Sequence, residues 1–140
     1  MSKIEVNTVA PQCGTTLTLG ESGDTVTLGS GASQSGFGRT GTVDWQTTIK
    51  TGDFTATSGE GYFINTTSGA ITMTLPASPT IGDEVSFIDY AGTFDTNNLT
   101  VGRNSHNIQG SAADLTVSTE RAGFTLVYVD STQGWLLKDK

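Results

Sequence analysis

The side chains in this sequence that could perform acid–base or metal chemistry are few and widely spaced. His106 is the only histidine and Cys13 the only cysteine among the 140 residues, so one chain offers no histidine cluster and no paired thiolates for a metal ion. Ser105, His106 and Asp114 are the residue types of a nucleophilic triad, but no sharp strand-to-helix turn accompanies the serine. The sequence therefore predicts no metal site and no nucleophilic active site.

Two pairs of carboxylates raise the alternative of glycoside hydrolysis, which needs two acidic groups flanking the scissile bond. Asp83 is followed directly by Glu84, and Asp89 is followed six residues later by Asp95. Both pairs adjoin turn signals, and turns favour aspartate for backbone reasons alone. We therefore interpret these carboxylates as turn residues and predict that the protein is not an enzyme and uses no cofactor.

The composition favours an all-β protein that has no nucleic-acid partner and does not insert into a membrane. Charged residues make up 15% of the chain and hydrophobic residues 34%, while 18 residues are glycine, as is typical of strands joined by turns. The net charge is −7 and the seven basic residues are scattered, whereas a phosphate backbone requires clustered lysine and arginine. No apolar run approaches the roughly 20 residues of a membrane helix, and no signal-peptide core is visible. We expect synthesis in the cytoplasm.

Residues 1–41 differ in composition from the rest of the chain. Ten of the eleven aromatic residues lie from Trp45 onward, and the front segment is dominated by glycine, serine and threonine. Within it, TLTLG at residues 16–20 returns as TVTLG at residues 25–29, which predicts two short strands joined by a turn at residues 20–24. Four aliphatic side chains alternate with the threonines on these strands: Leu17, Leu19, Val26 and Leu28.

These four side chains are too few to order the front segment in a single copy. Full burial stabilises by about 1.5 to 3 kcal/mol for each such side chain, whereas fixing the backbone costs about 1 to 2 kcal/mol for every residue. Several copies could close the deficit by packing their apolar stripes on a common axis, which would also cover the open strand edges. We therefore interpret residues 1–41 as a shaft that associates in several copies, with a linker near residues 29–41. The alternative is a disordered linker throughout.

Residues 42–140 predict a β-sandwich. Short apolar or alternating runs are separated by turn signals at intervals of about 8 to 12 residues. Residues 71–75 alternate strictly, whereas residues 124–129 are apolar on both faces and predict an interior strand. The expected strands cover residues 45–49, 61–65, 70–75, 84–89, 98–101, 107–109, 114–118, 124–129 and 134–138.

An ordered series of motifs in this second region resembles a module that recurs in bacteriophage tail fibres and virion spikes. The motifs of the module are LPASP at 75–79, GDEVSFID at 82–89, NNLTVGRN at 97–104, NIQG at 107–110, ADLTV at 113–117, FTLVY at 124–128 and GWLL at 134–137. The first region carries a second resemblance. Its IEVNTVAP at residues 4–11, followed by GTTLTL at 14–19, is similar to the openings of fibre proteins in marine and cyanobacterial phages.

The resemblance implies a homotrimeric virion protein with two regions. Residues 1–41 would dock on a capsid or tail protein and start the threefold axis, and residues 42–140 would form a jelly-roll-like β-sandwich head that faces outward. We expect the head to contact a host surface glycan or protein through polar and aromatic loop residues. These candidates are Tyr90, Asp95, Asn97, Asn98, Arg103, Asn104 and His106.

Other functions remain open at the level of sequence. The chain is shorter than usual for a host-recognition tail fibre, which leaves a head fibre, a capsid decoration protein or a tail-accessory spike without a receptor role. The loop candidates would then be solvated turn residues. A carbohydrate-binding module unrelated to virions is a further alternative, and it would be expected to be monomeric.

Overall fold

The front segment forms a turn in the single chain. The computed structural model describes residues 9–10, 14–15, 17–27, 30 and 43–138, and the chain divides into the units Met1–Thr40 and Gly41–Lys140. In the first unit the N–H of Asp24 donates to the carbonyl of Glu21 (3.0 Å), and the N–H of Glu21 donates to Oδ2 of Asp24 (2.8 Å). Residues 17–27 contain no strand. The predicted turn is confirmed, whereas strands paired between copies stay a prediction.

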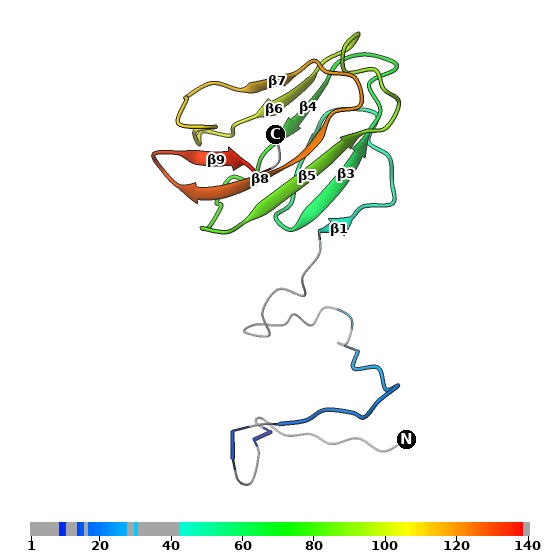
Figure 1. Cartoon of the computed structure of the whole chain (residues 1–140), viewed down its shortest axis with the longest axis vertical. Helices are drawn as coiled ribbons and strands as arrows, with labels where there is room; N and C mark the ends of the chain where they lie inside the picture. Colours follow the sequence, from blue (N-terminus) through cyan, green and yellow to red (C-terminus); the bar gives the residue numbers. More distant parts are fainter. Residues whose placement is uncertain (1–8, 11–13, 16, 28–29, 31–42, 139–140) are drawn as a thin grey trace. The chain divides into compact units, whose positions relative to one another are not determined.

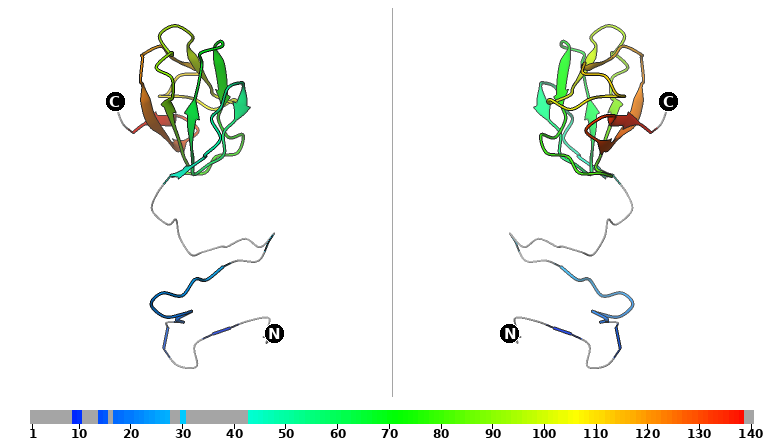
Figure 2. Two further views of the ribbon diagram at one scale, coloured as in Figure 1. Left: turned by 90° about the vertical axis from the view of Figure 1, so that its right-hand side faces the viewer. Right: turned by 90° about the vertical axis from the view of Figure 1, so that its left-hand side faces the viewer.

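The second unit is all-β, as the sequence predicts, and the described residues contain no helix. They consequently include none that could span a membrane. Its nine strands form two facing layers, seen in Figure 1 and from the sides in Figure 2. The strands are β1 (Asp44–Trp45), β2 (Phe54–Thr55), β3 (Glu60–Ile64), β4 (Ile71–Thr74), β5 (Glu84–Asp89), β6 (Leu99–Gly102), β7 (Leu115–Val117), β8 (Gly123–Asp130) and β9 (Gly134–Leu137).

The first six strands alternate between the two sheets. The five-stranded sheet has the order β1-β3-β5-β8-β9 and the four-stranded sheet the order β2-β4-β6-β7. Pairs β1–β3, β3–β5, β2–β4 and β4–β6 are parallel. Parallel neighbours need a crossover connection, and here each crossover is a strand of the opposite sheet.

This winding corrects the jelly-roll expectation. A jelly roll consists of antiparallel strands in two Greek keys, whereas here only β5–β8, β8–β9 and β6–β7 are antiparallel. The broader prediction of a β-sandwich agrees with the two mixed sheets. Alternation within a strand predicts which face is buried but not the direction of its neighbour, so the sequence could not distinguish the two topologies.

The core lies between the sheets and follows the alternation of each strand. In β4 and the residue after it, Ile71, Met73 and Leu75 are buried, while Thr72 and Thr74 are half-buried. Val85 and Phe87 of β5 face them from the other sheet as members of the same core cluster. The strictly alternating run at residues 71–75 is therefore a strand with one core face, as predicted.

Most predicted strands are present, with differences at the edges. The expected strand at 45–49 is reduced to β1 and an isolated bridge at Lys50, and the one at 107–109 is an isolated bridge at Ile108. The prediction missed β2, because two residues are too few to show a periodicity. β8 lies between β5 and β9, which confirms that the strand with two apolar faces is interior.

Candidate binding groove

The predicted loop residues do not form one surface. They fall on opposite sides of β6 along the chain: Tyr90, Asp95, Asn97 and Asn98 precede it, and Arg103, Asn104 and His106 follow it. A strand advances about 3.3 Å per residue, so the two groups emerge at opposite ends of this strand. The two groups therefore belong to separate loops.

Asp89 organises the loop that precedes β6. Its side chain is 1% exposed, and its carboxylate accepts the backbone N–H groups of Gly92 (2.9 Å), Thr93 (3.2 Å), Phe94 (3.2 Å) and Arg121 (3.1 Å). Burial by itself raises the pKa of this carboxyl, but the four N–H donors outweigh it and hold the pKa below the ordinary 3.8. Asp89 therefore fixes a turn as a buried anion, which agrees with its interpretation as a turn residue.

Within the same loop, one predicted contact residue serves the fold and two remain open to solvent. Nδ2 of Asn97 donates to the carbonyl of Thr66 (2.9 Å), which ties the loop to the turn after β3. Tyr90 and Asp95 are exposed. An outside partner would therefore meet Tyr90 and Asp95, whereas replacing Asn97 would disturb the loop itself.

The loop that follows β6 is tied to the β4–β5 connection. Nδ2 of Asn104 donates to the carbonyl of Leu75 (2.8 Å), and Nε2 of His106 lies 3.1 Å from the carbonyl oxygen of Ala77. The imidazole also meets the ring of Tyr128 edge to face, with centroids 5.5 Å apart. These contacts give Asn104 and His106 a role in holding two loops together.

Several residues considered for catalysis have a local structural contact. The N–H of Arg103 donates to Oδ1 of Asp114 (2.9 Å), and Asp83 accepts the N–H of Thr80 (2.8 Å). In the described part of the chain, no group of three or more histidine, cysteine or acidic residues is arranged to hold a metal ion. The carboxylates of Asp83 and Asp114 thus accept backbone N–H groups of the loops that they adjoin.

Three of the four predicted shaft residues are exposed in the single chain. Leu17, Leu19 and Val26 are 43%, 54% and 64% exposed. Leu28 lies outside the described residues, as do most of the predicted docking and linker segments. The packing of this stripe against other copies therefore remains a prediction.

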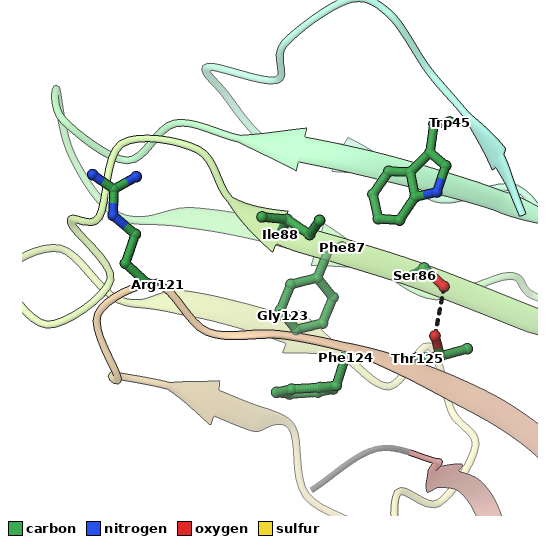
Figure 3. Close-up of a pocket in the computed structure, with 8 residues that line it drawn as sticks. All are labelled: Trp45, Ser86, Phe87, Ile88, Arg121, Gly123, Phe124 and Thr125. Carbon is green, nitrogen blue, oxygen red and sulfur yellow. Dashed lines mark hydrogen bonds between the residues drawn. The ribbon is translucent and has the colours of Figure 1, made fainter.

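A groove of about 380 Å³ lies on the five-stranded sheet, and the sequence did not predict it. Trp45, Ser86, Ile88, Arg121 and Thr125 are among the residues that line it (Figure 3). The register places Trp45, Gly61, Ser86 and Thr125 in one row across the four strands β1, β3, β5 and β8. Because side chains alternate along a strand, these residues face away from the core that holds Val85 and Phe87.

An exposed tryptophan forms one end of the groove. A Cβ on Gly61 would lie 2.7 Å from the ring of Trp45, so the indole lies directly over this glycine. Phe63 supports the indole, with ring centroids 5.1 Å apart. Trp45 is nevertheless 38% exposed and Ile88, farther along the groove, is 39% exposed. The sheet therefore presents a flat aromatic and aliphatic surface to solvent.

The floor and the far end of the groove are polar. The hydroxyls of Ser86 and Thr125 are buried and share one hydrogen bond of 2.8 Å (Figure 3). Arg121 lies beyond Ile88, at the opposite end from Trp45 (Figure 3). Its NH1 donates to the carbonyl of Tyr90 (2.9 Å). Of the residues that line the groove, the sequence singles out only Trp45, as the start of the aromatic-rich region.

The comparisons with known proteins give no family for this chain. No known family model matches it, and no curated protein matches it significantly. The resemblance to phage fibre modules consequently depends on the sequence motifs alone.

Proposed function

We propose that this protein is a structural component of bacteriophage particles, a short homotrimeric fibre or spike. Residues 1–41 dock on a capsid or tail protein and form the trimer axis. The sandwich faces outward and contacts a host surface glycan or protein. The resemblance of the sequence motifs is the basis for the virion location and for the number of copies.

The observation that carries the proposal is the exposed aliphatic stripe of the first unit. Leu17, Leu19 and Val26 are apolar side chains within the described residues 17–27, which contain no strand. Burial of such side chains is worth about 1.5 to 3 kcal/mol each, and one copy does not obtain it. Association of several copies is the simplest way to bury the stripe, because identical segments supply identical stripes.

The second unit supports an outward-facing role because its core is complete within one copy. Trp135, Phe87 and Leu126 are buried between its own two sheets. The unit therefore does not require its neighbours for a core, and its loops and outer faces remain available for contact. This division of roles corresponds to a shaft that assembles and a head that is presented.

The experiment that tests the proposal is light scattering of the purified chain after size exclusion, with a double variant, Leu19→Asp and Val26→Asp. We expect a trimer that dissociates in the variant, because each introduced charge would be buried on the axis. A matched double variant, Thr18→Asp and Thr27→Asp, changes the charge equally on the neighbouring positions and should dissociate less. A monomeric parent chain, or equal dissociation in both variants, would contradict the proposal.

The competing function is a decoration or accessory protein that lacks a receptor role. Free protein added to susceptible bacteria should block infection if the sandwich binds the host surface. A decoration protein should bind particles from which it has been removed, and should leave infection unchanged. A monomer that binds glycans would instead favour a carbohydrate-binding module.

A further inference from the structure

We propose that the groove on the five-stranded sheet binds an acidic saccharide. The pyranose face of one sugar packs on Trp45, and the carboxylate of a neighbouring sugar binds Arg121. This inference deepens the proposed host-surface role of the sandwich and names its ligand class.

The aromatic end of the groove is shaped as a platform. The indole of Trp45 lies over Gly61, where a side chain would collide with it, and rests against Phe63. These contacts fix one face of the ring, while 38% of the residue remains open to solvent. A rigid ring with one free face provides contact area at a low entropic cost, and it suits the flat, weakly polar face of a sugar ring.

The floor of the groove offers an unused donor. Ser86 and Thr125 carry one O–H each, and their single shared bond uses one of the two hydrogens. No other hydrogen bond of either hydroxyl occurs within the described residues. Because both side chains are buried, the remaining O–H and the free lone pairs would gain from a polar ligand. Sugar hydroxyls both donate and accept, and so fit this pair.

Within the described residues, the far end of the groove carries a positive charge that has no carboxylate partner. In the described part of the chain, the guanidinium of Arg121 has a hydrogen bond to the Tyr90 carbonyl and no ion pair. A Cβ on Gly92 would lie 2.6 Å from its Nε, so the group rests closely on the backbone. A guanidinium held in this way keeps further N–H donors for a planar carboxylate. The charge therefore favours an acidic sugar over a neutral one.

The distance between the two ends fits at least two sugar units. Trp45 belongs to the row of Ser86, Ile88 lies two residues farther along β5, and the Tyr90 carbonyl that holds Arg121 lies two residues beyond that. At about 3.3 Å per residue, the rows of Trp45 and Arg121 are separated by about 13 Å. A single sugar cannot reach both, so an acidic oligosaccharide is the expected ligand.

Gly123 keeps the middle of the groove open. It is paired with Ile88, and a Cβ there would lie 3.1 Å from Cγ1 of Ile88. A larger side chain would therefore fill the space between Trp45 and Arg121. The groove depends on glycine at Gly61, under the platform, and at Gly123, along the path.

The test is titration calorimetry of the full chain with oligosaccharides of galacturonic acid, guluronic acid and N-acetylneuraminic acid. A galactose oligosaccharide of the same length is the neutral control. We expect at least one acidic probe to bind, and to bind about 10-fold or more tightly than the neutral control. Arg121→Gln keeps the backbone N–H that Asp89 accepts, and should remove this preference. Trp45→Ala should weaken all binding, and Trp45→Phe should restore part of it.

Lys50→Gln provides the matched control, because it removes one positive charge that lies over the rings of Phe54 and Tyr62 and does not line the groove. Its affinities should equal those of the parent chain. The inference is overturned if no acidic probe binds at millimolar concentration, if the neutral probe binds equally well, or if Arg121→Gln has no effect. It is also overturned if Trp45→Ala dissociates the oligomer without any saccharide binding, since a second copy would then occupy the groove.

Failure of saccharide binding can be distinguished from failure of the proposed trimeric virion role. A trimer that ignores every saccharide would leave the virion proposal standing and remove the groove. A monomer that binds an acidic saccharide through Trp45 and Arg121 would support the groove and contradict the virion proposal. Light scattering on the same samples separates these cases.

Discussion

The two units of the chain contain the same alternation of aliphatic residues and threonine, but with opposite burial. In the front unit, Leu17 and Leu19 flank Thr18 and are exposed. In the sandwich, Ile71 and Met73 flank Thr72 and are buried against the opposite sheet. The difference shows that alternation specifies an amphipathic strand, whereas the stability of that strand depends on a partner surface.

The partner surface has a different origin in the two units. The sandwich supplies its own, since each turn of its winding returns to the sheet it left. The front unit has few apolar side chains and no aromatic residue within its described part. Other copies of the chain could supply the surface that covers the stripe, which is the physical basis of the proposed association.

The largest effect should follow from replacing a core residue of the sandwich. Met73→Ala leaves a cavity between the sheets, and we expect the free energy of unfolding of the second unit to fall by about 2 to 5 kcal/mol. Chemical denaturation followed by Trp135 fluorescence measures it. An equal loss of this free energy of unfolding in Leu17→Ala, in the front unit, would contradict the difference in burial between the two units.

The next effect concerns the buried carboxylate of the sandwich. Asp89→Asn loses charge-assisted hydrogen bonds, and should lower the free energy of unfolding by about 1.5 to 3 kcal/mol. Asp95→Asn, at an exposed position of the same loop, should change it by less than about 0.5 kcal/mol. Equal effects of the two variants would show that the N–H contacts of Asp89 contribute little.

The same carboxylate predicts a pH dependence. Because the pKa of Asp89 is lower in the folded protein than its ordinary 3.8, the unfolded chain takes up a proton at a higher pH than the folded chain. The stabilisation is complete above that value, and is lost as the pH falls below it. Thermal melts between neutral pH and pH 3 should show a smaller acid loss in Asp89→Asn than in the parent chain.

A smaller effect is expected under the platform of the groove. Gly61→Ala forces the Trp45 ring to move, since the added Cβ would lie 2.7 Å from it. The ring is at the surface and can swing outward, so we expect a loss of about 1 kcal/mol. Gly52→Ala, where a Cβ meets no atom within 4 Å, is the matched control. An unchanged Trp45 environment in Gly61→Ala, seen by NMR, would contradict the described stacking.

The smallest effect should come from deleting the front unit. A chain starting at residue 42 keeps every strand of the sandwich, so its intrinsic free energy of unfolding should change by less than about 0.5 kcal/mol. The same deletion should abolish association. A sandwich that fails to fold without residues 1–41 would mean that the two units depend on one another.

The sequence determined the strands and most of the core, because these follow from local patterns. Residues 71–75 and 84–89 show where a strand lies and which face is buried, and glycine and aspartate mark the turns between strands. The same reasoning identified the predicted loop residues. It did not show that Asn97 and Asn104 bond to distant carbonyls, since those carbonyls lie about 30 residues away.

Only the tertiary structure decided the strand directions and the groove. Parallel pairing of β3 with β5 depends on how the chain crosses between sheets, and no local pattern encodes that path. The path brings Trp45 and Arg121, which are far apart in the sequence, to the two ends of one surface. Side chains at such distances become neighbours through backbone pairing across several strands, which is a property of the assembled sheet and not of any segment within it.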